Sequence, residues 1–193
     1  MVRHAAKQYY HELSTIMSSI RVTDGSGNRV DFYEGIEKAG CLITAQTYSE
    51  RKVMFIGNGA SAAISSHMST DFWKNGGMRA VAFNDSSILT CIGNDFGYEH
   101  LFEKPIEMFA QEGDVLVSIS SSGKSENILL GVKAARVKQC KVITLSGFAA
   151  DNPLCSLGDV NFYVPAQAYG PVEILHHSIC HCILDTIMSV KNG

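Results

Sequence analysis

The chain has 193 residues, of which 46% are hydrophobic, and its formal net charge is −3. This length and apolar content are typical of one domain with a complete core. The slightly acidic balance and the lack of a long basic run argue against nucleic acid as a partner. The polar, helix-like N-terminus differs from a signal peptide, and no apolar run approaches the roughly 20 residues of a membrane span. We therefore expect a soluble, cytoplasmic protein without a membrane partner, with residues 1–193 forming a single domain.

Residues 1–50 are expected to form a helical extension within that domain. Helices are predicted at 4–20 and 31–48, and the residues between them at 22–28 are rich in Gly, Asn and Asp, which is typical of a turn. The long apolar helix near the C-terminus is expected to bundle with these two helices and with another subunit. The sequence therefore also predicts a homo-oligomer.

From residue 52 onward, short strands rich in Val and Ile alternate with helices. Their mostly continuous apolar runs are typical of strands covered on both faces. This order predicts an α/β fold, with a parallel sheet in a three-layer αβα sandwich. The predicted strands are 52–57, 79–84, 114–120, 141–146 and 160–164, and the predicted helices are 60–75, 86–93, 98–110, 125–138 and 171–190.

Two connections from strand to helix are unusual in composition. The chain reads Gly-Asn-Gly-Ala-Ser at 57–61 and Ser-Ser-Ser-Gly-Lys-Ser at 120–125. Such loops present backbone N–H groups and hydroxyls at a helix N-terminus, where the helix dipole favours an anion. One serine is enough to cap a helix, so the others suit the oxygens of a phosphate. The sequence therefore predicts a phosphorylated small molecule at the carboxyl ends of parallel strands.

Each loop also has other interpretations. The first fits the GxGxx(G/A) pattern of dinucleotide-binding folds, with Asp85 as a candidate for the acid that binds the ribose, and it also fits a plain tight turn. The second ends like a P-loop, but Ser118 occupies the place of the first glycine, which excludes that motif. A solvated serine-rich turn is the alternative for 120–125.

Acidic and histidine side chains recur at helical spacing on two predicted helices. His67 and Asp71 are four residues apart, and so are Glu173, His177 and His181 in turn, so each set shares one helix face. Such groups on facing helices supply either proton transfer or a Zn²⁺ site. Glu173 and His181 are about 12 Å apart along a straight helix. Spacing alone therefore favours His177 paired with either neighbour, or ligands from different subunits.

Asn94 and Asp95 follow a short predicted helix. The pair fits an ordinary Asx turn, and it fits equally well a contact between its amide and carboxylate and the hydroxyls of a sugar.

These motifs resemble the sugar isomerase (SIS) domain family, and within it the phosphoheptose isomerases, over most of the chain. The segment Gly-Asn-Asp-Phe-Gly at 93–97 and the serine-rich loop are together its most specific part. The resemblance is carried by residues 57–61, His67, 91–97, 113–116, 119–125, 141–147 and the last helix with His181.

The resemblance implies a flavodoxin-like fold with a five-stranded parallel sheet, and a homotetramer with its sites at subunit interfaces. It also implies an aldose–ketose isomerase that converts sedoheptulose 7-phosphate to D-glycero-D-manno-heptose 7-phosphate through an enediol. A non-catalytic SIS module that binds a phosphosugar or a protein such as a replication initiator is an alternative, as is an isomerase of another phosphosugar. The presence of His67 and His181 favours an enzyme.

The resemblance implies one Zn²⁺ per site on His67, Asp71, Glu173 and His181, and it assigns acid and base chemistry to Asp71, Glu173 and His181. The family typically has Glu at the position of Asp71 and Gln at that of Glu173. The loops and the resemblance together predict a substrate site formed by Asn58, Gly59, Ala60, Ser61, Asn94, Asp95, Ser120, Ser121, Ser122, Ser125 and Glu173.

Overall fold

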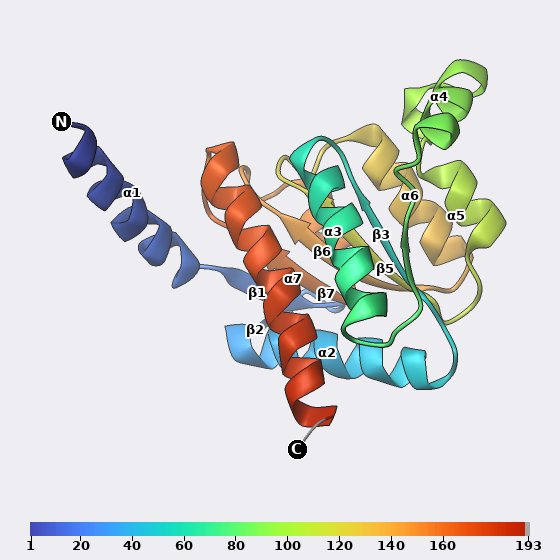
Figure 1. Cartoon of the computed structure of the whole chain (residues 1–193), viewed down its shortest axis with the longest axis horizontal. Coiled ribbons are helices and arrows are strands. Elements are labelled where there is room, and N and C mark those ends of the chain that lie inside the picture. The colour runs from blue at the N-terminus through green and yellow to red at the C-terminus, as the bar shows by residue number, and fades with distance from the viewer. Residues whose placement is uncertain (192–193) are drawn as a thin grey trace.

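A central sheet separates two layers of helices in the computed structural model, which describes residues 1–191 (Figure 1). Residues 192–193, the end of the predicted domain, lie outside the described residues. The strand order is β2-β1-β7-β6-β5-β3-β4. The last five in this order are mutually parallel, so the predicted three-layer α/β class is confirmed. Their bounds are β3 Val53–Gly57, β4 Ala80–Ala82, β5 Val115–Ser120, β6 Lys141–Ser146 and β7 Val160–Tyr163.

All five predicted parallel strands are present, but the sheet has two further strands, and the prediction of a simple turn at 22–28 is wrong. Residues Arg21–Asp24 form β1 and Arg29–Val30 form β2, a hairpin whose first strand pairs antiparallel with β7. Val22 of β1 is buried in the core, whereas its neighbours are polar, and this alternation is typical of a strand with one covered face. The turn itself is narrower than predicted, and Asp24 holds it by accepting hydrogen bonds from the backbone N–H groups of Ser26 and Asn28.

The two helical layers enclose separate apolar clusters. Helices α2 (Phe32–Tyr48), α3 (Ala60–Lys74) and α7 (Tyr169–Lys191) cover one face, where the rings of Phe55 and Phe72 pack edge to face. Helices α5 (Glu103–Phe109) and α6 (Glu126–Val137) cover the other face. Short elements complete this side: α4 (Ser86–Asp95), η1 (Tyr98–His100) and η2 (Pro153–Ser156).

The predicted helix at 98–110 is two elements in the structure. A short 3₁₀ helix at Tyr98–His100 is followed by α5, which begins at Glu103. Pro105 accounts for the division, because proline has no N–H and its ring clashes with the carbonyl four residues earlier inside a helix, whereas it is tolerated in the first turn.

The position of the site follows from the strand order. The chain runs from β3 outward to β4 in one direction, and from β5 outward to β6 and β7 in the other. In an open α/β sheet, ligands bind outside the carboxyl ends of the strands where this direction reverses. Here that place lies between β3 and β5, and the loops 57–61 and 120–125 follow these two strands.

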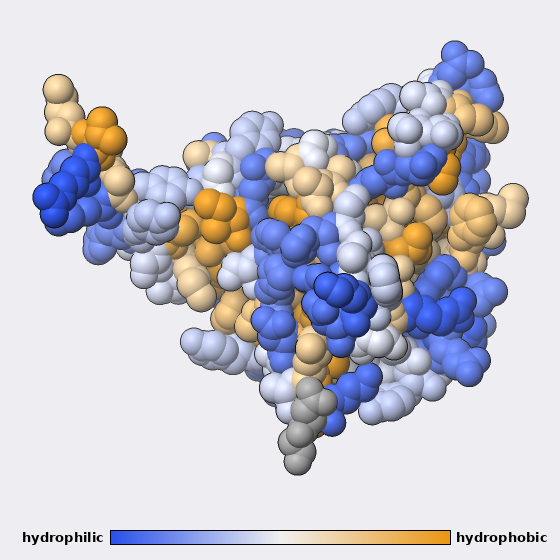
Figure 2. All heavy atoms as spheres, viewed as in Figure 1, coloured by the Kyte–Doolittle hydropathy of each residue, from blue (hydrophilic) through white to orange (hydrophobic). Residues whose placement is uncertain are grey.

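Helix α1 (Val2–Met17) differs from the rest of the fold. None of its residues is buried, and it extends from one end of the molecule (Figures 1 and 2). Within residues 1–191, no helix combines the length and the apolar character needed to cross a membrane.

Candidate active site

A pocket of about 250 Å³ lies between the two glycine- and serine-rich loops. Most of the predicted substrate residues line it, and Glu173 of α7 joins them although it is distant in sequence. The structure therefore brings together both loops and one of the predicted carboxylates. The lining residues are Asn58, Gly59, Ala60, Ser61, Ser120, Ser121, Ser122, Ser125, Tyr169 and Glu173.

The helices that begin at this pocket lack side-chain caps. Gly59 is the N-cap of α3 and Ser125 that of α6, and neither helix receives a capping hydrogen bond from a side chain. In contrast, Asp31 caps α2 and Asp85 caps α4 through their carboxylates. The expectation that a serine of the second loop caps its helix is thus wrong. Two helix N-termini whose N–H groups no side chain satisfies are suited to an anion.

Asp85 accordingly has a structural role. Its carboxylate accepts hydrogen bonds from the backbone N–H groups of Ser87 and Ile88 at the start of α4. This interaction gives no support to its interpretation as the ribose-binding acid of a dinucleotide fold.

Two glycines give the loops their shape. Gly59 has a φ of +54° and ψ of −122°, and a Cβ there would meet no atom within 4 Å, so the backbone at the pocket is open to a ligand. Gly123 has a φ of +62°, and its backbone N–H donates to Ser120 Oγ at 3.1 Å. A Cβ on Gly123 would come within 1.9 Å of Asn152 Oδ1.

Asn94 and Asp95 are not among the residues that line this pocket. They lie exposed at the end of α4, where Asn94 Nδ2 donates to Asp95 Oδ1 at 2.8 Å. The structure of one chain does not bring this predicted pair to the other substrate residues.

Three histidines of α3 and α7 form a cluster that lies further along these helices than the residues of the pocket. His67 of α3 lies against His177 and His181 of α7, with ring centroids 4.8 and 5.3 Å away. One nitrogen from each ring lies within 4.8 Å of the others, which is a group able to hold a metal ion. Asp71 Oδ2 lies 3.2 Å from His67 Nε2 at the edge of this cluster. Glu173, which the resemblance places among the ligands, lies in the pocket instead.

The environment of His177 favours its neutral form. Burial lowers the pKa of its imidazole, and the nearby His181 and His67 lower it further, whereas Asp71 acts in the opposite direction. A metal binds the neutral imidazole, so the cluster chemically fits a metal such as Zn²⁺.

The pocket and the histidine cluster lie along one seam between α3 and α7, which pack against each other. On α7, Tyr169 and Glu173 line the pocket, and His177 and His181 follow one and two turns later. On α3, Ala60 and Ser61 line the pocket and His67 lies further along the same helix. Figure 1 shows the two helices running side by side from the carboxyl edge of the sheet.

Tyr169 was not singled out from the sequence. It lines the pocket one turn before Glu173, and its ring packs against Phe148 at 5.0 Å between centroids. The signal that points to it is the same four-residue spacing that links Glu173, His177 and His181, extended backward by one step.

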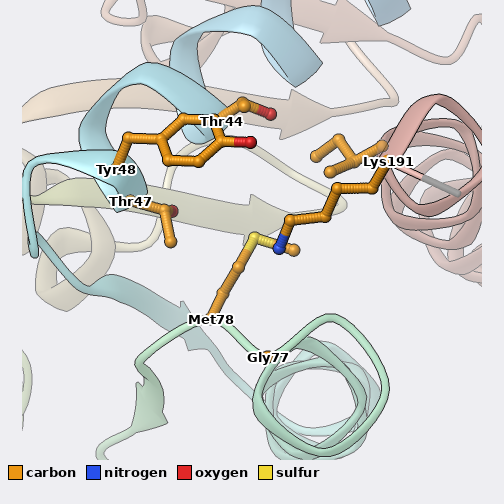
Figure 3. Close-up of a pocket in the computed structure, with 7 residues that line it drawn as sticks. Thr44, Thr47, Tyr48, Gly77, Met78 and Lys191 are labelled. Carbon is orange, nitrogen blue, oxygen red and sulfur yellow. The ribbon is translucent and has the colours of Figure 1, made fainter.

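A second cavity, of about 180 Å³, contains none of the predicted site residues. Figure 3 shows Thr44, Thr47 and Tyr48 of α2 on one side of it and Lys191 of α7 on another. Lys191 Nζ donates to the carbonyl of Gly76 at 3.3 Å, so this cation already has an acceptor. None of the histidines and carboxylates of the α3–α7 seam lines this cavity.

An αβα sandwich whose glycine- and serine-rich loops lie where the strand order reverses is typical of proteins that bind phosphorylated small molecules. Residues 8–147 of the chain match the SIS domain family. Among curated relatives, the chain is 37% identical over 160 residues to the phosphoheptose isomerase of Photorhabdus laumondii, covering 80% of this chain and 82% of that protein. It is 36% identical to the phosphoheptose isomerase of Helicobacter hepaticus, covering 80% and 81%. The chain therefore belongs to the phosphoheptose isomerase family of SIS domain proteins, which confirms the resemblance.

Solved structures agree with this assignment. The phosphoheptose isomerase from Neisseria gonorrhoeae superimposes with a TM-score of 0.83 at 28% identity, covering 98% of this chain and 100% of that one. The phosphoheptose isomerase from Francisella tularensis gives the same TM-score at 25% identity, covering 97% and 98%.

Proposed function

We propose that this chain is a phosphoheptose isomerase that interconverts sedoheptulose 7-phosphate and D-glycero-D-manno-heptose 7-phosphate. The observation that carries the proposal is the α3–α7 seam, where an anion pocket, a carboxylate and three histidines follow one another. Relatives that align with about four-fifths of this chain are named phosphoheptose isomerases, and this supports a phosphorylated heptose as the substrate.

The pocket binds the phosphate end of the sugar in this proposal. Ser120, Ser121, Ser122 and Ser125 supply hydroxyls, and the first turns of α3 and α6 supply N–H groups. Charge-assisted hydrogen bonds of this kind are roughly twice as strong as neutral ones. Anchoring the phosphate fixes the other end of the sugar relative to the acid and base groups, which lowers the entropic part of the barrier.

We assign proton transfer to the carboxylate in the pocket and to a histidine two turns further along α7. The carboxylate of Glu173 takes the proton from the carbon beside the carbonyl, which leaves an enediol, and returns it to the neighbouring carbon. His181 moves the compensating proton between the two oxygens through the ring nitrogen that would not hold the metal. Asp71 lies against His67 and is the second candidate for the base. General acid–base groups contribute roughly 10²–10⁴-fold each.

We also propose that the cluster binds Zn²⁺ and that His67 and His181 are among its ligands. When bound, the ion would act as a Lewis acid that stabilises negative charge on the enediol oxygens. The three imidazoles and the adjacent carboxylate of Asp71 are donors that zinc accepts.

We also propose that the chain forms a homo-oligomer and expect this oligomer to be a tetramer. Helix α1 is 16 residues long with no buried residue, although Tyr10 and Met17 are large apolar side chains on it. An isolated helix of this length is marginal in water, so packing against other subunits would explain its stability. Light scattering of the full chain, compared with a chain lacking residues 1–19, tests this: we expect a tetramer for the first and a smaller species for the second.

The direct test is an assay of the purified chain with sedoheptulose 7-phosphate, before and after treatment with a chelator. We expect conversion to the aldose, its loss on chelation, and recovery when Zn²⁺ is added back. Binding of the sugar phosphate without turnover would instead indicate a non-catalytic SIS module. Turnover of a shorter phosphosugar in preference to the heptose would indicate a different isomerase.

A further inference from the structure

Four side chains of α7 follow one another at intervals of four residues, yet they face two different places. Tyr169 and Glu173 line the serine-rich pocket, whereas His177 and His181 lie against His67 of α3. We infer that His177, and not Glu173, completes the metal site, and that Glu173 stays in the pocket to face the substrate. This inference rests on the proposed function, because the metal is the one proposed there.

The arrangement of the rings supports a three-histidine site. The ring centroids of His177 and His181 are 4.7 Å apart, and each ring also approaches His67 within 5.3 Å. One donor nitrogen from each side chain already lies within 4.8 Å of the other two. Ligands of one tetrahedral zinc ion are roughly 3.3 Å apart, given Zn–N bonds near 2.0–2.1 Å. Small side-chain rotations would bring the three nitrogens to that spacing.

One ring nitrogen of His177 lacks a hydrogen-bond partner among the described residues. This atom, Nε2, is buried. A buried polar atom without a partner costs roughly 1–3 kcal/mol, so native proteins rarely leave one. A metal bound at this nitrogen would remove the cost, and the histidine would then have a reason to lie between α3 and α7.

The reach along α7 argues against Glu173 as a ligand. His177 is one turn, about 6 Å along the helix, from both Glu173 and His181, whereas Glu173 and His181 are about 12 Å apart. His67 lies with His177 and His181, so the group that can hold a metal is at the His181 end of this stripe. Glu173 lines the pocket with Tyr169 and the serines. For Glu173 to join the cluster, its carboxylate would have to leave the pocket that it lines.

Asp71 has a different part in this arrangement. Its Oδ2 lies 3.2 Å from His67 Nε2, the position of a carboxylate that orients a ligand histidine. Three imidazole ligands leave the fourth position of a tetrahedral ion open, as in catalytic zinc sites. The site is thereby divided between a histidine group for the metal and Glu173 for the sugar.

Metal binding by alanine variants tests this division without any use of activity. The full-length wild type, H177A, E173A and H11A are stripped with a chelator and titrated with Co²⁺, and the bound metal is counted and followed by its visible absorption. Alanine is used because a glutamine at position 173 could itself donate an oxygen to the metal. His11 lies exposed on α1, outside the cluster, so H11A is the matched control. We expect one Co²⁺ per chain with equal affinity for wild type, E173A and H11A, and a loss of about 100-fold or more for H177A.

A cysteine variant guards against simple misfolding of H177A. In H177C, a thiolate at the same place would restore Co²⁺ binding and add an intense sulfur-to-cobalt absorption, a signal that only direct coordination produces. The inference is overturned if E173A loses the metal, if H177A keeps it at wild-type affinity, or if H177C binds Co²⁺ without that absorption.

The failure of this inference is separable from the failure of the proposed function. A wild type that binds no Co²⁺ overturns the metal site. If the same preparation still converts sedoheptulose 7-phosphate, the isomerase proposal stands, and if it does not, both fall.

Discussion

Asn58 and Asn127 are joined by two reciprocal hydrogen bonds between their side-chain amides. Asn58 Nδ2 donates to Asn127 Oδ1 at 2.9 Å, and Asn127 Nδ2 donates to Asn58 Oδ1 at 2.8 Å. The hydroxyl of Tyr98 also donates to Asn58 Oδ1, at 3.3 Å. Asn58 follows β3 and lines the pocket, whereas Asn127 is buried in the first turn of α6. The pair therefore fixes the two anion-binding helix starts relative to each other.

Removal of Asn127 tests this connection. We expect N127A to lower the free energy of unfolding by about 1–3 kcal/mol, because the half-buried amide of Asn58 loses both of its hydrogen bonds to Asn127, and to raise KM for the sugar phosphate. Urea unfolding and steady-state kinetics measure the two effects. N75A, at an exposed position that ends α3, is the control; an equal effect in both variants would show that the pair has no special role.

The serine-rich loop predicts a specific kinetic pattern. We expect S121A and S122A each to raise KM for the phosphosugar about tenfold or more, because a hydrogen bond to a charged group is worth about 1.5–3 kcal/mol. The value of kcat should change little, since the phosphate is held equally in the ground and transition states. S156A, an exposed serine of η2, should behave as wild type. A fall in kcat at constant KM would contradict the role in phosphate binding.

Gly123 offers a test of loop geometry. In G123A, a Cβ would come within 1.9 Å of Asn152 Oδ1, and an alanine would have to adopt a φ of +62°. We expect the displaced loop to raise KM, and the strain to lower the free energy of unfolding by about 1–3 kcal/mol. Thermal unfolding and kinetics measure both. Wild-type values in G123A would show that the loop tolerates another conformation.

Two substitutions test whether Glu173 or Asp71 is the catalytic base. We expect E173Q to lower kcat by roughly 10²–10⁴-fold, because it removes the proton acceptor in the pocket. We expect H181A to lower kcat by a factor in the same range. D71N, which keeps the size of the side chain beside His67, should lose less activity than E173Q. A larger loss of kcat in D71N than in E173Q would assign the base to Asp71.

His176 should make the stability of the protein depend on pH. It is fully buried, with Nε2 3.0 Å from the carbonyl oxygen of Ser146, and burial lowers the pKa of its imidazole from 6.5 to about 4. Between these two values the unfolded chain binds a proton that the folded chain does not, so stability falls as the pH falls from 6.5 to 4. The expected loss is about 3 kcal/mol.

Urea unfolding of wild type and H176L in chelator, at pH 7 and pH 4, measures this loss as a difference. Wild type should lose about 3 kcal/mol more than H176L over this range, because the other groups titrate alike in both. Equal losses would show that His176 takes up its proton in the folded state at its ordinary pKa.

Local patterns allowed most of the layered fold to be predicted. Apolar runs of strand length between helix-like segments identified the parallel strands, and Gly and Ser after β3 and β5 marked the pocket. The hairpin of β1 and β2 was missed because its turn residues dominate a short segment, and only pairing with β7 shows that Val22 is in a strand. The break before α5 depends on Pro105, which the sequence contains but the helical periodicity obscures.

The division of the site could not be predicted in the same way. Helical spacing placed Glu173, His177 and His181 on one stripe, but it does not show where along that stripe the neighbouring helix approaches. The packing of α3 against α7 decides this, and it sets His67 beside His177 and His181 rather than beside Glu173. Likewise, the lack of side-chain caps on α3 and α6 depends on the conformations of Gly59 and Ser125 and not on residue type alone.

Proton NMR of the reaction in D₂O tests the central claim most directly. When the purified chain is incubated with sedoheptulose 7-phosphate, proton transfer through an enediol predicts that an aldose signal appears and that solvent deuterium enters the carbon beside the new carbonyl. If the sugar phosphate stays unchanged and gains no deuterium while wild-type protein is folded and supplied with Zn²⁺, the isomerase account of this chain is contradicted.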